Sequence, residues 1–302
     1  MDIGMVGLGR MGGNMARRLR RGGHRVVGFD PGAAIAGGIQ DADGPERVDS
    51  LQALVQALPV PRVVWMMVPA GAPVDATLDL LLPLLQPGDV LVDGGNSNYR
   101  DSERRAARCR DAGVQLLDCG TSGGVWGLQE GYSLMIGGDE AAAALLRPVF
   151  ETLAPAPDRG WGHVGPSGAG HFAKMVHNGI EYGMMQAYAE GFAIMQRKDA
   201  MALDLAQVGR IWQHGSVVRS WLLDLAVEAL EGNPSLEGIA PYVSDSGEGR
   251  WTVAEAIELD VSAPVITLSL LERLRSREKD SYADKMLAAL REGFGGHGVR
   301  RG

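Results

Sequence analysis

The sequence predicts a two-domain protein, in which an α/β domain with a doubly wound, mostly parallel sheet precedes an all-α domain. Three observations support this fold class. Short apolar runs alternate with helical segments in the first half, a glycine-rich turn follows the first run, and only helical spacing follows a stretch crowded with Pro and Gly. The 302 residues also exceed what one hydrophobic core usually serves.

Six apolar runs are expected to form strands, at residues 2–6, 25–29, 62–68, 89–93, 114–118 and 132–136. Between them lie segments with helical periodicity, at 11–21, 74–86, 101–111 and 140–153. Such alternation is typical of parallel βαβ units.

Residues 155–170 form the strongest break in the chain after residue 100, because Pro and Gly are crowded there. We place the domain boundary in this stretch, with one domain at 1–167 and a helical domain with a C-terminal tail at 168–302. The second domain is expected to begin with a long helix at 171–197.

Composition excludes several classes of protein. The net charge of −8 comes without a basic stripe, which argues against a nucleic-acid partner. No apolar run approaches the roughly 18 residues of a membrane span, so no membrane partner is expected. The start of the chain, with Asp2 and no basic segment before an apolar stretch, argues against a signal peptide and for a cytoplasmic location. Cys109 and Cys119 lie outside any C-x-x-C spacing, which favours reduced thiols over a disulfide or structural zinc.

A glycine-rich fingerprint opens the helix expected after the first strand. It consists of Gly7, Leu8, Gly9, Arg10, Met11 and Gly12. In such a fingerprint the first glycine permits a tight turn, the second lets the backbone approach a pyrophosphate, and the third lets helix and strand pack closely. The second strand ends in Asp30 about twenty residues later, which completes the Rossmann dinucleotide-binding pattern. A glycine-rich turn that binds nothing is the alternative, and this context argues against it.

Asp30 also bears on the choice of dinucleotide. Its carboxylate can accept hydrogen bonds from a ribose diol but repels a 2′-phosphate, and the next residues, Pro31, Gly32 and Ala33, offer no cation. NAD is therefore favoured over NADP.

A polar stripe runs along the long helix expected after the boundary. Lys174, His177, Asn178 and Glu181 fall at i, i+3, i+4 and i+7, which puts them on one face. The alternative is that these four residues form a solvated stripe, or that the lysine and the glutamate merely form an ion pair. Because the remaining faces are apolar, we interpret the helix as central and the stripe as lining a cleft, where desolvation can lower the pKa of a lysine to make a base and raise that of a glutamate to make an acid.

These motifs together resemble the 6-phosphogluconate dehydrogenases, within the larger β-hydroxyacid dehydrogenase group. The glycine fingerprint, Asp-Gly-Gly-Asn-Ser at 93–97, Thr-Ser-Gly-Gly at 121–124 and a lysine followed four residues later by asparagine are similar to motifs of the larger group. The run His-Asn-Gly-Ile-Glu-Tyr-Gly at 177–183 is similar to the 6-phosphogluconate enzymes in particular. The match spans essentially the whole chain.

The resemblance implies oxidative decarboxylation of 6-phospho-D-gluconate to D-ribulose 5-phosphate and CO₂ with reduction of NAD, a reaction of the pentose phosphate pathway. It implies that Lys174 takes the proton of the C3 hydroxyl and that Glu181 later protonates C1 of the enediol. The 3-keto acid loses CO₂ between these steps because its carbonyl accepts the electrons of the carboxylate. No metal is required.

The resemblance also implies binding residues. Val68, Pro69 and Asn96 would join the fingerprint and Asp30 at the cofactor. The sugar acid's carboxylate and hydroxyls would contact Asn96, Ser122, Gly123, Gly124, His177 and Asn178. Tyr182, Arg250, Thr252 and Arg273 would bind at the phosphate end, with Arg250 standing where many members carry lysine. A solvated position on an amphipathic helix is the alternative for Arg273.

The C-terminal tail resembles the family's terminal arginine and histidine, six positions apart, in Arg291 and His297. In the family these residues reach the substrate of a neighbouring subunit, which implies a homodimer or homotetramer with tail exchange. A frayed, functionless terminus is the alternative. The chain lacks the second helical repeat of the longer members and so resembles the short form, and Asp30 replaces the Asn-Arg-Thr type of sequence found in NADP-dependent members.

Three other functions stay open from the sequence. Another β-hydroxyacid dehydrogenase, such as 3-hydroxyisobutyrate dehydrogenase, would use the same lysine without phosphate recognition. A serine hydrolase is suggested by the G-x-S-x-G match at 120–124, with Ser122 as nucleophile. A non-catalytic dinucleotide sensor would need neither Lys174 nor Glu181.

Overall fold

The computed structural model describes residues 1–32, 43–295 and 298–300, so Ala33, Gly296 and His297 lie outside the described residues. The chain divides into two compact units, Met1–His177 and Asn178–Gly302. Each unit is described by itself.

The first unit is built on one eight-stranded sheet with the order β3-β2-β1-β4-β5-β6-β7-β8. All neighbouring strands are parallel except β6 and β7, which are antiparallel. The strands are β1 (Asp2–Val6), β2 (Arg25–Phe29), β3 (Glu46–Arg47), β4 (Val63–Met66), β5 (Val90–Asp93), β6 (Gln115–Ser122), β7 (Ser133–Gly137) and β8 (Trp161–Gly165). All six expected strands are present, and the doubly wound, mostly parallel sheet is confirmed.

Two strands were not predicted from the sequence. β3 is two exposed residues long and has no apolar side chain to signal it. β8 lies inside the Pro- and Gly-rich stretch that we took as the boundary, and as an edge strand it buries too little to give an apolar run. The sheet therefore continues into that stretch.

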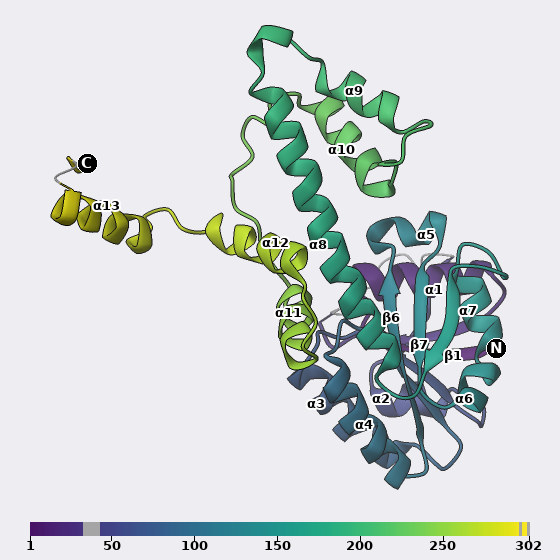
Figure 1. The fold of residues 1–302 in the computed structure, drawn as a ribbon. Helices are drawn as coiled ribbons and strands as arrows, with labels where there is room; N and C mark the ends of the chain where they lie inside the picture. Colours follow the sequence, from purple (N-terminus) through teal and green to yellow (C-terminus); the bar gives the residue numbers. More distant parts are fainter. Residues whose placement is uncertain (33–42, 296–297, 301–302) are drawn as a thin grey trace. The chain divides into compact units, whose positions relative to one another are not determined.

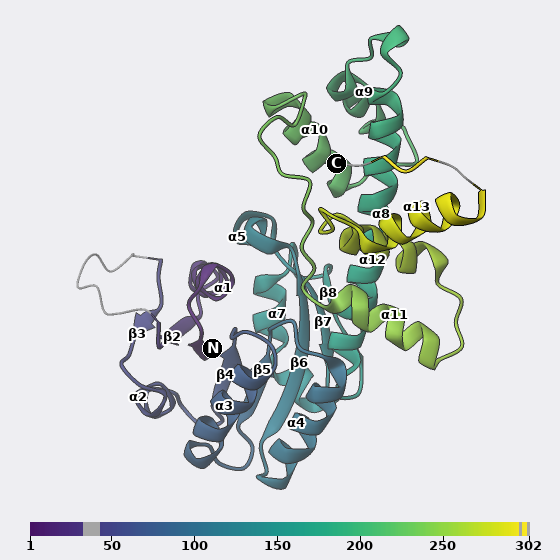
Figure 2. The same ribbon diagram turned by 90° about the vertical axis from the view of Figure 1, so that its left-hand side faces the viewer.

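Helices cover both faces of the sheet (Figure 2). One core cluster joins the sheet to α1 (Arg10–Arg21), α6 (Glu140–Leu145) and α7 (Arg147–Leu153) through residues such as Met15 and Phe150. The other joins it to α2 (Leu51–Gln56), α3 (Ala72–Leu81) and α4 (Tyr99–Asp111) through residues such as Leu54 and Leu78. Two short helical segments follow β6, η2 (Gly124–Trp126) and α5 (Gly127–Glu130).

The expected helices agree with α1, α3, α4 and the α6–α7 pair. A 3-10 segment, η1 (Leu82–Leu84), extends α3. The helix expected at 140–153 is broken at Leu146, because Pro148 in the first turn of α7 has no N–H with which to continue α6. With only six residues, α2 was too short to show a helical period.

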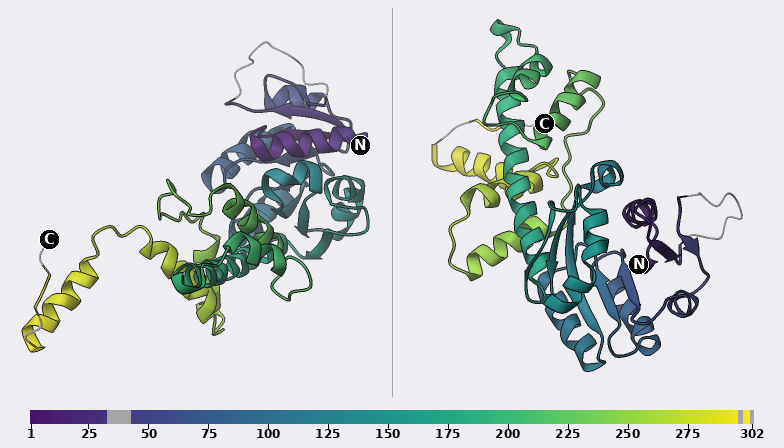
Figure 3. Two further views of the ribbon diagram at one scale, coloured as in Figure 1. Left: turned by 90° about the horizontal axis from the view of Figure 1, so that it is seen from above. Right: turned by 90° about the vertical axis from the view of Figure 1, so that its right-hand side faces the viewer.

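The second unit is helical, as the sequence predicts: its described residues contain no strand. The helix expected at 171–197 is α8 (Ala169–Gln196), one unbroken helix that begins in the first unit (Figures 1 and 3). It is followed by η3 (Asp199–Met201), α9 (Leu205–Trp212), α10 (Trp221–Gly232), α11 (Glu248–Glu258), α12 (Pro264–Arg275) and α13 (Tyr282–Gly295).

A buried carboxylate fixes the start of α8. Asp118 on β6 is 1% exposed and accepts hydrogen bonds from the N–H of Gly168 at 2.7 Å and of His171 at 2.8 Å. These N–H groups belong to the helix start, where they lack partners within the helix and where the helix dipole favours a negative charge. The His171 ring is in turn 2.7 Å from the hydroxyl of Ser102 on α4. The first turn of α8 is therefore anchored to both the sheet and a sheet-covering helix.

Gly120 lets α8 approach β6 closely. A Cβ atom at Gly120 would lie 2.4 Å from Cβ of Lys174 and 2.6 Å from the carbonyl oxygen of Gly170. Because both contacts involve atoms close to or in the helix backbone, they cannot be relieved by rotating a flexible side chain. Lys174 is thus placed directly against the end of β6.

Replacing Gly120 by alanine tests this packing. We expect Gly120→Ala to destabilise the first unit by about 1–3 kcal/mol and to lower its melting midpoint by about 2–12 °C. Gly162→Ala on β8 is the matched control, because no atom lies within 4 Å of its Cβ position. Thermal unfolding followed by circular dichroism measures both, and equal midpoints would show that α8 does not rest on β6 at this point.

Candidate active site

The carboxyl ends of the parallel strands bring most of the predicted cofactor residues to one edge of the sheet. The glycine fingerprint follows β1, Val68 and Pro69 follow β4, and Asn96 follows β5. β1 lies between β2 and β4, so the chain leaves it in one direction and returns on its other side. Dinucleotides bind at this kind of switch point in open α/β sheets.

The three fingerprint glycines have different surroundings. Gly7 has a φ of +90° and, given a Cβ, would meet the carbonyl oxygen of Met67 at 2.4 Å. A Cβ on Gly12 would lie 2.0 Å from the carbonyl oxygen of Gly7. At Gly9, by contrast, no atom lies within 4 Å of the Cβ position, and its side chain position is open at the start of α1. The first and third glycines are thus required by packing, whereas the second leaves room for a phosphate at a helix N-terminus.

Asp30 is oriented towards this loop. Its carboxylate accepts hydrogen bonds from the N–H of Leu8 at 2.6 Å and of Gly32 at 2.8 Å. The N–H of Leu8 belongs to the fingerprint itself, so the acid at the end of β2 and the glycine turn after β1 form one structure. A carboxylate at this place can also accept hydrogen bonds from ribose hydroxyls. The residues fit a dinucleotide.

The loop after β5 is held by Asp93, which is 1% exposed. Its carboxylate accepts hydrogen bonds from the N–H of Gly95 at 3.1 Å and from the hydroxyl of Ser97 at 2.6 Å. Between these two residues Asn96 is exposed. The buried aspartate therefore shapes a loop that presents an asparagine amide at the same sheet edge as the fingerprint.

The end of β6 supplies the other predicted residues of the first unit. Ser122 is the last residue of this strand, and Gly123 and Gly124 follow with φ angles of +126° and +51°, which favour glycine. Lys174 is 7% exposed, and the half-buried His177 lies one turn further along α8. The first unit thus contains the cofactor set, the lysine and part of the predicted substrate set.

The polar stripe continues on the same helix into the second unit, where Asn178 and Glu181 are both half-buried. Within a single chain, the interpretation of α8 as a central helix does not hold for its later turns. Ile180, Met184 and Met185 are 52%, 39% and 41% exposed, although they are apolar. The apolar pattern that suggested burial is not covered by this chain alone.

Four residues predicted at the phosphate end are in the second unit. Tyr182 is 5% exposed, and the guanidinium of Arg273 lies 3.4 Å from its ring centroid while donating to the carbonyl oxygen of Ser244 at 3.0 Å. Gly249 packs against the same ring, since a Cβ there would lie 2.5 Å from Cε2. Arg273 is therefore held on an aromatic face and is not a freely solvated arginine. Thr252, on α11, is buried with its hydroxyl bonded to the carbonyl oxygen of Glu248.

Two residues beside this cluster, Asp245 and Arg277, were not predicted as site residues from the sequence. Asp245 accepts hydrogen bonds from Nε and Nη2 of Arg250 at 3.1 and 3.3 Å and from Arg277 at 2.7 Å. The hydrogen bonds from Arg250 above all, with those of Arg277, hold the pKa of Asp245 below its usual range although desolvation opposes them. The arginine at position 250 was the one sequence feature that could have pointed to a carboxylate partner. A guanidinium can bind a carboxylate through two N–H groups from different nitrogens, and a lysine cannot.

The tail residues are not brought to this cluster within the described residues. Arg291 is exposed on α13, and His297 lies outside the described residues. An ion pair between Arg275 and Asp284 joins α12 to α13. The apolar side chains Tyr282, Leu287 and Leu290 are 75%, 60% and 55% exposed on α13.

The described residues lack a metal-binding group, a membrane-spanning helix and a reactive cysteine. No group of three or more metal-ligating side chains occurs among them. No described helix has the length and apolar character needed to cross a bilayer. Cys109 and Cys119 are free and buried, and burial raises the pKa of both thiols, that of Cys109 to about 11, so neither is a reactive thiolate.

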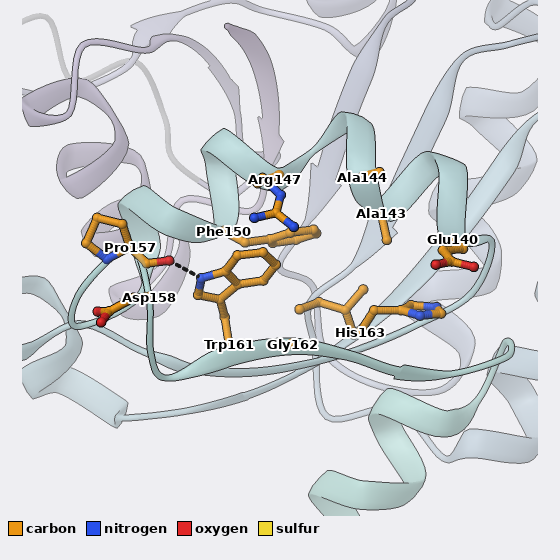
Figure 4. A pocket seen from close by; sticks show the side chains of 11 residues that line it. Glu140, Ala143, Ala144, Arg147, Phe150, Pro157, Asp158, Trp161, Gly162 and His163 are labelled. Carbon is orange, nitrogen blue, oxygen red and sulfur yellow. Dashed lines mark hydrogen bonds between the residues drawn. The ribbon is translucent and has the colours of Figure 1, made fainter.

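A separate pocket of about 380 Å³ lies between α6, α7 and β8 (Figure 4). Trp161 stacks on Phe150 there, with the guanidinium of Arg147 5.3 Å from its ring centroid. None of the predicted site residues lines this pocket, so it is not part of the candidate active site.

Comparisons with known proteins assign both parts of the chain to one family. Residues 2–164 match the NAD binding domain of 6-phosphogluconate dehydrogenase, and residues 170–297 match the C-terminal domain of 6-phosphogluconate dehydrogenase. The NAD(+)-dependent, decarboxylating 6-phosphogluconate dehydrogenase of Haloferax volcanii is 47% identical over 302 residues, covering 100% of this chain and 99% of the relative. The putative 6-phosphogluconate dehydrogenase YqeC of Bacillus subtilis is 42% identical, covering 100% of both chains.

Among solved structures, Plasmodium falciparum 6-phosphogluconate dehydrogenase superimposes with a TM-score of 0.84 at 27% identity. The match covers 100% of this chain but 66% of that chain. The chain is thus similar in length to the first two relatives and shorter than the third, as expected for the short form.

The contact between Asp30 and Leu8 leads to a test of cofactor preference. We expect Asp30→Ala to lower kcat/KM with NAD by about 10- to 100-fold, since charged hydrogen bonds to the ribose and to the fingerprint loop are lost. Activity with NADP should fall less, because the repulsion of the 2′-phosphate is removed as well. Asp43→Ala, which removes an exposed acid 2.9 Å from Arg21, is the control and should change neither constant. Equal kcat/KM values with NAD and NADP in the parent protein would contradict the role of Asp30.

Proposed function

The chain belongs to the 6-phosphogluconate dehydrogenase family, and we propose that it oxidatively decarboxylates 6-phospho-D-gluconate to D-ribulose 5-phosphate and CO₂ with NAD as the oxidant. The observation that carries the proposal is the content of α8. This one helix bears a buried lysine, Lys174, anchored against β6, and a buried tyrosine, Tyr182, stacked by an arginine. A base and a phosphate-binding pair are what this substrate requires.

Lys174 starts the reaction by accepting the proton of the C3 hydroxyl. The glycine fingerprint and Asp30 would hold the dinucleotide, whose nicotinamide would supply the oxidant as the acceptor of hydride from C3. The resulting C3 ketone lies β to the carboxylate, so the C1–C2 bond breaks, CO₂ leaves, and its electron pair forms the enediol while the ammonium of Lys174 returns a proton to the C3 oxygen. Glu181 then protonates the carbon that lost CO₂, which becomes C1 of the product, while the neutral amine of Lys174 takes the proton of the neighbouring enediol hydroxyl as that carbon becomes the ketone.

The remaining predicted residues bind the substrate. Asn96, together with Ser122 and the glycines after it, donates to the carboxylate and hydroxyls, and His177 and Asn178 extend this set along α8. The phosphate is bound by Tyr182, Arg250, Thr252 and Arg273. The stacked Arg273 supports this assignment, since a planar guanidinium held in place can bind phosphate through two N–H groups.

The two domains divide these tasks. We assign NAD binding to residues 1–167 and the larger part of substrate binding to 168–302, with Asn96 and residues 122–124 of the first domain completing the substrate site and with NAD preferred over NADP on account of Asp30. We place the enzyme in the cytoplasm, because phosphorylated sugar acids and dinucleotides are charged and do not cross membranes unaided.

Oligomerisation fits the exposed apolar residues of the second unit. Ile180, Met184 and Met185 on α8 and the apolar side chains on α13 would be buried by a second copy of the chain. We propose a homodimer, or a homotetramer built from it, in which the tail bearing Arg291 and His297 reaches the substrate of a neighbouring subunit.

The rival functions fit less well. A 3-hydroxyisobutyrate dehydrogenase would have no use for the Tyr182–Arg273 pair, because its substrate lacks phosphate. A sensor would not need the buried Lys174. The G-x-S-x-G match has a structural cause at its first glycine, because Gly120 packs against Lys174 and Gly170.

The activity is tested with purified protein and NAD. We expect reduction of NAD with 6-phosphogluconate and not with 3-hydroxyisobutyrate, with one CO₂ released for each NADH formed, measured by absorbance and by trapping labelled CO₂. Reduction of NAD without CO₂, or with 3-hydroxyisobutyrate alone, would contradict the proposal.

The two proton-transfer groups are tested separately. Lys174→Met should lower kcat by at least about 10²-fold, because hydride cannot leave C3 while its hydroxyl keeps its proton, and NAD affinity measured by calorimetry should stay within experimental error. Glu181→Gln should lower kcat similarly, whereas Glu190→Gln, an exposed site on the same helix, should have no effect. A Glu181→Gln enzyme as fast as the parent would show that another group donates the proton.

The tail is tested by truncation after Leu290. Removal of Arg291 and His297 should raise KM for 6-phosphogluconate strongly and leave NAD affinity little changed, since cationic groups near an anionic substrate are lost. Mixing truncated subunits with Lys174→Met subunits should restore part of the activity, because a mixed dimer has one site with an intact lysine and an intact partner tail. If the mixture stays inactive although mass spectrometry demonstrates subunit exchange, the tail contributes only to the site of its own subunit.

A further inference from the structure

Arg105 on α4 is a fully buried arginine with no part in the chemistry described so far. Its side chain is 0% exposed, whereas that of its neighbour Arg104 is 55% exposed. Burying a guanidinium costs several kcal/mol unless its charge and its donors are satisfied. A buried Arg105 therefore requires charged and hydrogen-bonding partners, and the identity of these partners indicates its role.

One side of the guanidinium binds the start of α3. Nε and Nη2 donate to the two carboxylate oxygens of Asp75 at 3.0 and 2.9 Å, and Nη2 also donates to the carbonyl oxygen of Gly71 at 3.0 Å. Hydrogen bonds from Arg105 first, and from Arg104, hold the pKa of Asp75 well below its usual range, so its negative charge persists at any physiological pH. Gly71 and Asp75 lie two and six residues after Pro69 in the chain.

The other side binds the loop after β5. Nη1 donates to the hydroxyl oxygen of Ser97 at 3.2 Å and lies 3.7 Å from Oδ2 of Asp93. The same Ser97 hydroxyl donates to Asp93 at 2.6 Å, and Asp93 accepts the N–H of Gly95. Arg105, Ser97 and Asp93 thus form one chain of hydrogen bonds that ends in the backbone beside Asn96.

We propose that Arg105 is a positioning residue that fixes the loops after β4 and β5 relative to each other, so that Asn96 meets the nicotinamide and the reacting sugar carbon in productive geometry. The inference rests on the proposed function, because it assigns Asn96 and the loop after β4 to that reaction. Only a planar fork can serve both loops at once: a lysine could keep the charge but could not make the parallel bonds to Asp75 and also reach Ser97. A displacement of about 1 Å in such a positioning group can cost about 10²-fold in rate.

The first test uses the protein without cofactor or substrate. Arg105→Lys keeps the charge, and Arg104→Lys is the matched control, because Arg104 is adjacent, exposed and 3.1 Å from the same Asp75. We expect amide hydrogen exchange of residues 93–97 to become faster in Arg105→Lys and to stay unchanged in Arg104→Lys. Unchanged exchange in both variants would overturn the proposal whatever the enzyme's substrate is.

The second test measures catalysis. In Arg105→Lys, kcat should fall by about 10- to 100-fold, KM for 6-phosphogluconate should change much less, and the kinetic isotope effect of substrate deuterated at C3 should rise, because hydride transfer becomes slower. NAD affinity, measured by calorimetry, should change by less than about fivefold, since the fingerprint and Asp30 are untouched. If thermal stability falls but kcat, calculated per site that can still bind ligand, is unaltered, the role of Arg105 is purely structural and the proposal is overturned.

Ser97→Ala keeps the test decisive if Arg105→Lys fails to fold. It removes only the hydroxyl that connects Arg105 to Asp93, and the same faster exchange at 93–97 is expected. If exchange and kcat in Ser97→Ala match the parent, the hydrogen-bond chain does not position the loop. A parent protein inactive on 6-phosphogluconate would refute the proposed function but would leave the exchange experiment valid for Arg105.

Discussion

The buried carboxylate of Asp118 is the interaction on which the candidate active site depends. It joins the middle of β6 to the first N–H groups of α8, at the positive end of the dipole of a 28-residue helix. Gly120, two residues along the same strand, removes the side chain that would hold the helix away. These two residues together give Lys174 its buried position against β6, because Asp118 binds the start of the helix and Gly120 leaves room for it.

A division of labour follows from this arrangement. Two buried acids shape the first unit: Asp93 holds the Asn96 loop, and Asp118 holds the helix that bears the lysine. The positions that we propose for ligand binding, such as Gly9 and Asn96, are open or exposed. In the second unit an aromatic ring and a carboxylate have the same task, since Tyr182 stacks with Arg273 and Asp245 pairs with Arg250.

The sequence predicted those features of the fold and the site that depend on residues close together in the chain. The glycine fingerprint and Asp30 lie within one βαβ unit, so spacing alone predicted their association, and the helical period predicted the stripe from Lys174 to Glu181. Long-range partnerships could not be predicted in this way. Nothing in the local sequence shows that Arg105 binds Asp75 and Ser97, or that Asp245 pairs with Arg277, because these contacts depend on how separate elements pack. The edge strand β8 was missed for a related reason, as it is defined by its neighbour β7 and not by its own apolar residues.

The most direct test of the account is a crystal structure of the protein with NADH and 6-phosphogluconate bound. We expect Nζ of Lys174 within hydrogen-bond distance of the C3 hydroxyl, with C3 facing the nicotinamide. The phosphate should lie against Tyr182 and Arg273, and Asp118 should still be bonded to Gly168 and His171. A sugar acid bound with Lys174 remote from C3, or a phosphate held elsewhere, would contradict it.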